Sequence, residues 1–239
     1  MFYFLDETGS TIDDARDPKY VHGDVIVAEY QTAGRGQRGN KWSSAPGENL
    51  MFSVVLDTSF LRVTEQFLLL QTVALALADT FAEYGLDARI KWTNDIYIGD
   101  RKITGVLIDH SIKDGMLARS GVGIGINVNQ TEFEEWLPNP TSMALETGRE
   151  QDRRRVLDRL YEHLTERYGM LKRGRRREVA EQYHGKIYRL DTPAQFTKPG
   201  VEGSFTGIIC GVEPDGGLIV EDATGCRETY LFQQISFII

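Results

Sequence analysis

The segment from Gly121 to Asn129 alternates between branched apolar residues and residues that are small or polar. Side chains of a strand point in turn to its two faces. One face therefore holds Val122, Ile124, Ile126 and Val128 and must lie in a core, whereas the other holds three glycines and then two asparagines. Glycine weakens a strand, so this row indicates either a flat ligand lying on the face or close helix packing. The amides that end the row favour the ligand.

Length and charge limit the class of protein. The chain has 239 residues, 41% of them hydrophobic, which is enough for one sizeable domain and a small appendage. Its net charge of −8 argues against a protein that coats nucleic acid. Cys210 and Cys226 have no metal-ligand spacing, which favours a reducing compartment. The acidic N-terminal start and the lack of a long apolar run predict a cytoplasmic protein without a membrane partner.

Hydrophobic periodicity predicts the order of the elements. Ser10 can cap a helix that begins there, and a longer helix is expected from Thr64 to about Tyr84. Strands are expected at 25–28, 50–56, 89–92 and 117–128, with a hairpin of 95–98 and 102–109 closed by Gly99-Asp100. Residues 151–184 are predicted to be helical and charged. After residue 184, short β-rich runs between turn signals predict a small antiparallel barrel of about fifty residues.

The loop Gly34-Arg35-Gly36-Gln37-Arg38-Gly39 is one candidate for ligand binding. Its glycines allow the backbone to approach a ligand closely, and arginine offers a planar fork of donors for a carboxylate or phosphate. A flexible basic surface loop is the alternative. The loop is not a Walker P-loop, because it lacks the Gly-Lys-Ser/Thr ending.

A second candidate is the segment 91–105, around the predicted hairpin. Lys102 begins a strand, where a lysine is either a solvated edge residue or a positive charge for an anionic centre. Gly105 leaves room for a ligand nearby. Asn94 and Asp95 either bind polar groups or a metal-bridged phosphate, or form a turn at the start of a strand.

Five segments together resemble the biotin protein ligase family, in the class without an N-terminal DNA-binding domain. They occur in the family's order along the chain: 7–11 (Glu-Thr-Gly-Ser-Thr), 29–36 (Glu-Tyr-Gln-Thr-Ala-Gly-Arg-Gly), 91–95 (Lys-Trp-Thr-Asn-Asp), 101–105 (Arg-Lys-Ile-Thr-Gly) and 123–127 (Gly-Ile-Gly-Ile-Asn). The resemblance implies an α+β fold. Residues 1–184 would form a catalytic domain with a mixed β-sheet flanked by helices, the class II synthetase-like biotin/lipoate ligase fold, and residues 185–239 an SH3-like β-barrel.

The resemblance also implies an activity. An ATP-dependent ligase of this family forms biotinyl-AMP from biotin and ATP, and then transfers biotin to one lysine of a biotin carboxyl carrier protein, releasing AMP and pyrophosphate. ATP and Mg²⁺ are the expected cofactors and biotin the substrate. The expected partner is the carrier protein or domain of a biotin-dependent carboxylase. Neither nucleic acid nor a membrane is expected as a partner, and the chain would be a monomer or a homodimer.

Site residues follow from the resemblance position by position. Lys102 and Arg35 are the expected catalytic residues, and Asp95 is expected near the magnesium and phosphates. The expected biotin-binding residues are Ser10, Thr11, Gln31, Gly34, Arg35, Gly36, Gln37, Lys102 and Gly105. The expected nucleotide-binding residues are Arg35, Trp42, Asn94, Lys102, Gly123, Asn127, Thr141 and Ser142.

The sequence departs from the family pattern at three positions. Thr93 stands where the family often has proline, Ile12 where it often has asparagine, and Gln37 where it often has arginine. The last position helps to retain the adenylate in the family, so a neutral amide there predicts looser retention unless Arg38 compensates.

Three other functions are alternatives to this one. A lipoate ligase resembles this catalytic domain, but its Arg-Arg-x-x-Gly-Gly-Gly pattern is missing. A biotin-responsive repressor would need a helix-turn-helix, for which a catalytic pattern that begins near residue 2 leaves no room. A non-enzymatic biotin-binding module would not need Lys102 or the Asn94-Asp95 pair.

Overall fold

A seven-stranded mixed sheet organises the larger part of the molecule. The computed structural model describes residues 1–239, apart from the side chain of Arg38. The strand order is β1-β2-β3-β7-β6-β5-β4, and only β1 and β2 run parallel. The strands are β1 (Phe2–Thr8), β2 (Val25–Gln31), β3 (Leu50–Asp57), β4 (Ala88–Lys91), β5 (Asp95–Ile98), β6 (Arg101–Lys113) and β7 (Met116–Ile126).

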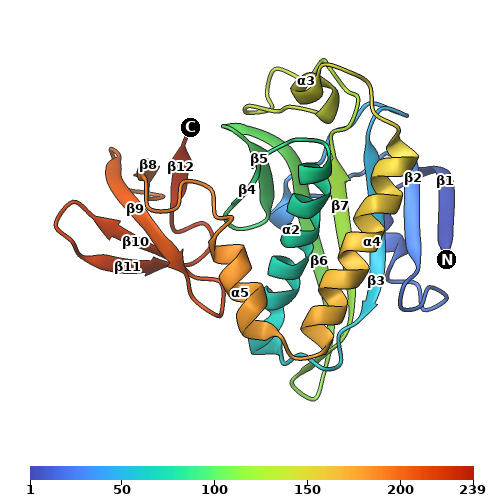
Figure 1. The fold of residues 1–239 in the computed structure, drawn as a ribbon, viewed down its shortest axis with the longest axis horizontal. Coiled ribbons are helices and arrows are strands. Elements are labelled where there is room, and N and C mark those ends of the chain that lie inside the picture. Colours follow the sequence, from blue (N-terminus) through green and yellow to red (C-terminus); the bar gives the residue numbers. More distant parts are fainter.

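The long helices cover one face of this sheet (Figure 1). They are α2 (Gln66–Glu83), α4 (Arg153–Lys172) and α5 (Arg176–His184), so the helices predicted at 64–84 and 151–184 are confirmed. Two short helices, α1 (Thr11–Asp14) and α3 (Met143–Thr147), and two 3₁₀ turns, η1 (Gln37–Gly39) and η2 (Val63–Glu65), complete this part. In the described part of the chain, no helix combines the length and the apolar character needed to cross a membrane.

Strand β7 has two unlike faces, and the expectation for one of them is confirmed. Val122, Ile124 and Ile126 are buried in the main core under α2 and α4. On the other face, an added Cβ at Gly121 would lie 3.2 Å from Ile12 Cδ1, and one at Gly125 would lie 2.3 Å from Trp42 Cε2. Gly123 and Gly125 also line a pocket, so the favoured expectation of a ligand on this face stays a prediction, beside the observed close packing. The glycines allow α1 and the Trp42 ring to lie directly on the sheet.

A second sheet follows α5. Its five antiparallel strands have the order β11-β10-β9-β8-β12. They are β8 (Pro193–Thr197), β9 (Phe205–Val212), β10 (Leu218–Asp222), β11 (Arg227–Tyr230) and β12 (Ser236–Ile238). The antiparallel strands expected after residue 184 are confirmed, but β11 and β12 do not pair, so the sheet is not a closed barrel. The connection between those two strands carries Phe232, which contacts the larger sheet's Trp92 instead of closing the barrel.

The two sheets meet at a small number of well-defined contacts. Trp92 Nε1 donates a 2.7 Å hydrogen bond to the carbonyl of Gly216 in the β9–β10 turn. Gly216 lies so close to Phe67 of α2 that a Cβ there would be 2.8 Å from the ring. Residues 186–188 pair with β4 through Ile90. We propose 184–185 as the domain boundary, with the following residues anchoring the second sheet to the first.

The central core makes a direct prediction about stability. Leu77 of α2 is fully buried against the sheet, so Leu77→Ala is expected to lower the free energy of unfolding by about 2–5 kcal/mol. Leu145 of α3 is 44% exposed, and Leu145→Ala is expected to change it by less than about 0.5 kcal/mol. Urea unfolding of both variants measures the difference. Equal effects would show that the core is assigned wrongly.

Candidate active site

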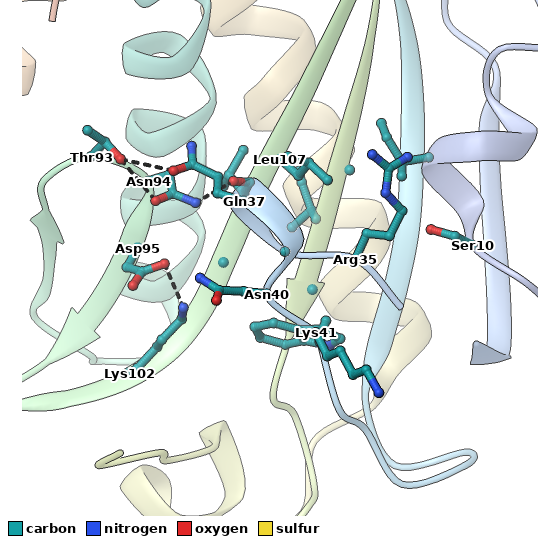
Figure 2. A pocket seen from close by; sticks show the side chains of 18 of the residues that line it. Ser10, Arg35, Gln37, Asn40, Lys41, Thr93, Asn94, Asp95, Lys102 and Leu107 are labelled. Atoms are coloured by element: carbon teal, nitrogen blue, oxygen red, sulfur yellow. Dashed lines mark hydrogen bonds and ion pairs between the residues drawn. The ribbon is translucent and has the colours of Figure 1, made fainter. Parts of the chain in front are cut away.

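The largest group of predicted site residues lines one pocket on the face of the sheet opposite α2 and α4 (Figure 2). The Gly-Arg loop, the β5–β6 hairpin and β7 supply its walls. Among its lining residues are Ser10, Thr11, Gln31, Arg35, Gly36, Gln37, Trp42, Asn94, Asp95, Lys102, Gly105 and Gly123. Segments separated by more than a hundred residues in the sequence are thus brought together.

One end of the pocket is built from α1 and the end of β2. Ser10 occupies the N-cap position of α1, yet its hydroxyl makes no capping hydrogen bond and, although buried, has no partner. The predicted capping role of that side chain is wrong. Gln31 Oε1 accepts from the Thr11 amide at 2.7 Å, and Thr11 Oγ1 accepts from Ser53 at 2.9 Å. The Ser10 hydroxyl, the Thr11 hydroxyl hydrogen and the Gln31 Nε2 group are left to bind a polar ligand.

The other end of the pocket carries an ion pair. Lys102 Nζ lies 2.7 Å from Asp95 Oδ1, and both side chains are largely shielded from solvent. Lys102 belongs to β6, which lies between β5 and β7, so the alternative of a solvated lysine on an edge strand is wrong. The geometry places a positive charge inside the pocket, balanced by the single carboxylate among the lining residues.

A second cavity adjoins the first. Trp42, Lys102, Asn40 and Lys41 line both. The remaining walls of the second cavity are Ser43, Asn127, Phe133, Trp136, Leu137, Pro138 and Pro140. Trp42 Nε1 is buried and has no hydrogen-bond partner. Lys102 therefore stands where a polar pocket and an aromatic cavity meet.

Arg35 lies at the rim of the first pocket. Its Nη1 is 2.5 Å from Asp13 Oδ1 and 4.0 Å from Asp109 Oδ2, and Arg16 pairs with the same two carboxylates. The guanidinium is therefore held by α1 and β6 while the backbone of its loop faces the cavity.

The backbone of the Gly-Arg loop is closed by hydrogen bonds between its two ends. The Trp42 amide donates to the Gly34 carbonyl at 3.0 Å, and the Gly36 amide to the Asn40 carbonyl at 2.7 Å. A Cβ at Gly34 would lie 2.5 Å from the Trp42 carbonyl oxygen, so Gly34 serves this close approach and is not itself among the lining residues.

Two predicted nucleotide-binding residues lie outside both cavities. Thr141 Oγ1 donates to Glu146 at 2.5 Å, and Ser142 Oγ accepts from the Leu145 amide at the N-cap of α3. Their side chains are used in folding that segment. Thr141 still supports the site, because its carbonyl accepts from Asn127 Nδ2 at 2.9 Å.

The residues of the site could hold Mg²⁺ only together with phosphate groups of a bound substrate. No group of three or more His, Cys, Asp or Glu side chains with metal-binding geometry occurs in the described residues. Asp95 alone is available, and Mg²⁺ is commonly held by one or two carboxylates together with substrate phosphates. Asn94 is already engaged, since its Nδ2 donates to the Val106 carbonyl at 2.6 Å.

Several lining residues were not predicted as site residues, among them Lys91, Trp92 and Phe232. Burial lowers the pKa of Lys91, whose Nζ lies 5.2 Å from the ring centroid of Tyr97 and 5.0 Å from that of Phe237. Lys91 and Trp92 could have been found, because they begin the 91–95 segment. Phe232 could not, because only the docking of the second sheet brings it to the pocket.

Comparison with known proteins agrees with this arrangement. Residues 1–129 match the model of the "Biotin/lipoate A/B protein ligase family". The Escherichia coli bifunctional ligase/repressor BirA is 31% identical over 207 residues, which cover 83% of this chain and 62% of that protein. The biotin–[acetyl-CoA-carboxylase] ligase of Mycobacterium tuberculosis is 29% identical, with 90% of this chain and 81% of that protein covered.

A solved structure adds agreement in fold. The biotin protein ligase from Aquifex aeolicus in complex with biotin and ATP superposes with a TM-score of 0.82 at 28% identity, covering 99% of this chain and 98% of that one. The family model alone spans more than half of the 239 residues. From its matched sequence and its shared fold, this chain belongs to the biotin/lipoate A/B protein ligase family.

Proposed function

We propose that the chain is a biotin protein ligase that joins biotin to AMP and then to a lysine of a carrier protein. One observation carries the proposal: Lys102 lies at the junction of a pocket with unused hydrogen-bonding groups and a cavity with aromatic walls. Biotin would occupy the first and the nucleotide the second. Its carboxylate and the α-phosphate would then meet beside the Lys102 ammonium group.

The polar end of the pocket matches the ureido ring of biotin. A cyclic urea offers a carbonyl acceptor flanked by N–H donors. Gln31 Nε2 and the Thr11 hydroxyl can donate to the carbonyl, and the buried Ser10 oxygen can bind either kind of group. A hydrogen-bonding site strongly rejects an analogue that leaves its polar groups unpaired. The dithiolane ring of lipoate makes no such bonds, which favours biotin within this family.

The reaction brings together two negatively charged groups. At 4 Å and an effective dielectric constant near 20, unit charges repel by about 4 kcal/mol. Lys102 offsets this repulsion by exchanging part of its contact with Asp95 for the reactants, and Arg35 would do so after leaving Asp13 and Asp109. A biotin carboxylate oxygen attacks the α-phosphorus and pyrophosphate leaves. When bound with ATP, Mg²⁺ would neutralise charge on the phosphates, with Asp95 as its protein ligand.

The second step requires the carrier's lysine as a neutral amine, which loses a proton to solvent as the amide forms. The lysine nitrogen attacks the acyl carbon of biotinyl-AMP, the bond to the phosphate oxygen breaks, and AMP leaves. Two relatives are named biotin–[acetyl-CoA-carboxylase] ligases, which supports a carrier domain of a biotin-dependent carboxylase as the acceptor. Catalysis by such a site depends on positioning and charge, since no protein nucleophile is needed.

The decisive experiment is transfer of labelled biotin to a carrier domain with ATP and Mg²⁺. Label on the carrier lysine, dependent on both ATP and the carrier, is the expected result. Lipoate offered in place of biotin is the matched control and is expected to give little transfer. Transfer of lipoate in preference to biotin would overturn the substrate assignment, and transfer of neither would overturn the proposed activity.

Removal of the Lys102 charge is expected to abolish most of the first step. Lys102→Ala should slow biotin-dependent ATP–pyrophosphate exchange by roughly a hundredfold or more, as when a preorganised donor is removed. Lys113 lies on the same strand but is exposed, so Lys113→Ala is the control and should exchange at nearly the normal rate. Near-normal exchange by Lys102→Ala would remove this lysine from the mechanism.

Loss of the Ser10 hydroxyl is expected to weaken biotin binding. Ser10→Ala should raise the Kd for biotin roughly tenfold, equivalent to about 1.4 kcal/mol and typical of one lost buried hydrogen bond. The fold should be retained because this hydroxyl makes no capping bond. Calorimetric titration with biotin measures the effect, and the exposed Ser59→Ala serves as control. An unchanged Kd would place the ureido ring elsewhere.

A further inference from the structure

The Gly-Arg loop is joined to the 91–95 segment by polar side chains. Thr93 Oγ1 lies 3.3 Å from Gln37 Oε1 and 3.1 Å from Asn94 Oδ1 (Figure 2). Asn94 Nδ2 in turn donates to the Val106 carbonyl of β6 at 2.6 Å. Gln37, Thr93 and Asn94 all line the pocket. We call this connected set the Gln37–Thr93–Asn94 chain.

Counting hydrogens fixes the direction of the bonds. A hydroxyl has a single hydrogen and cannot donate to Gln37 and Asn94 at once. The oxygen and nitrogen of a glutamine amide are assigned from their surroundings, and turning the Gln37 amide places Nε2 against Thr93. In the structure Thr93 Oγ1 donates to Gln37 Oε1 at 3.3 Å; with the amide turned, Gln37 would donate to Thr93, Thr93 to Asn94, and Asn94 to Val106. Each group has a partner, so the loop is tied by neutral hydrogen bonds to the middle of the sheet.

The two members at the loop end are both departures from the family pattern. In the biotin protein ligase family, which the sequence resembles, arginine is common at the position of Gln37 and proline at the position of Thr93. Proline has no side-chain donor or acceptor, so the Gln37–Thr93 bond cannot exist in a chain with that residue. In this chain the two replacements lie in hydrogen-bond contact with each other. The looser retention of the adenylate predicted from the sequence considers Gln37 alone. It does not include the hydrogen bond between Gln37 and Thr93.

We propose that Gln37 and Thr93 are positioning residues that together fasten the Gly-Arg loop over the activated intermediate. The proposal rests on the proposed function, because the intermediate is taken to be biotinyl-AMP. A closed loop excludes water from the mixed anhydride and delays its escape. Neutral hydrogen bonds are not screened by ions, unlike an exposed arginine–anion contact. The Gln37–Thr93 contribution to retention should therefore vary little with salt.

Release of biotinyl-AMP from the full chain, in the absence of carrier, tests the proposal. Thr93→Val keeps the shape but removes the hydroxyl, and should release the intermediate roughly tenfold faster, the effect of one lost hydrogen bond. Thr93→Ser restores the hydroxyl and should return release to within about twofold of the natural chain. Gln37→Met should also speed release. Because the two residues act as a pair, the double variant should be no faster than about the faster single variant.

A matched control exists in the second sheet. Gln195 Nε2 donates to Thr206 Oγ1 at 2.6 Å on the surface, far from the pocket in the sequence and in the fold. Thr206→Val removes a Gln–Thr bond of the same kind and should leave release unchanged. Release from Thr93→Val at the natural rate, or effects of Gln37→Met and Thr93→Val that multiply in the double variant, would overturn the proposal.

Trypsin gives a measurement that does not depend on the activity. The loop offers cleavage sites after Arg35, Arg38 and Lys41. In the ligand-free full chain, Thr93→Val should be cut in this loop several times faster than the natural chain, and Thr93→Ser should not. If no adenylate forms but this difference is seen, the fastening of the loop stands and the proposed function falls. Equal cleavage of all three chains would overturn the fastening.

Discussion

The site depends on one constraint, the unlike faces of β7. Branched residues on one face bury the strand under α2 and α4, and glycine on the other lets α1 and Trp42 lie against the sheet. A larger residue at Gly125 would displace the Trp42 ring, and with it the wall shared by the two cavities. The same strand therefore supplies the stability of the core and the shallow floor on which a polar pocket is built.

Two of the cations that line the pocket are paired with carboxylates in the structure. Lys102 is paired with Asp95, and Arg35 with Asp13 and Asp109. An unpaired buried charge would destabilise the ligand-free fold, whereas these partly exposed pairs are individually weak. Anionic reactants can therefore replace these carboxylates as partners of Lys102 and Arg35 at a small cost in free energy. The carboxylates thus keep the cations in place without competing strongly for them, and the arrangement suits a site that must bind two anions in turn.

Local patterns in the sequence predicted most of the architecture but not the contacts made at a distance. The helix of α2 and the hairpin of β5 and β6 follow from periodicity and the Gly99-Asp100 turn, and the pocket residues from short segments. The unbonded Ser10 hydroxyl, the roles of Thr141 and Ser142 around α3, and the open second sheet depend on tertiary packing. Strand β1 was not predicted, because its alternation is irregular and its pairing with β2 brings together distant residues.

The second sheet contacts the pocket both directly, through Phe232, and through the 91–95 segment. Trp92 is bonded to the Gly216 carbonyl and packs against Phe232, and the next residue is Thr93. The 91–95 segment is therefore held from one side by the second sheet and from the other by Gln37 of the Gly-Arg loop. A shift of the second sheet would move Trp92 and, through the adjoining peptide, the hydroxyl to which the loop is tied. The contacts of Trp92 with the second sheet and of Thr93 with the Gly-Arg loop therefore lie on adjacent residues.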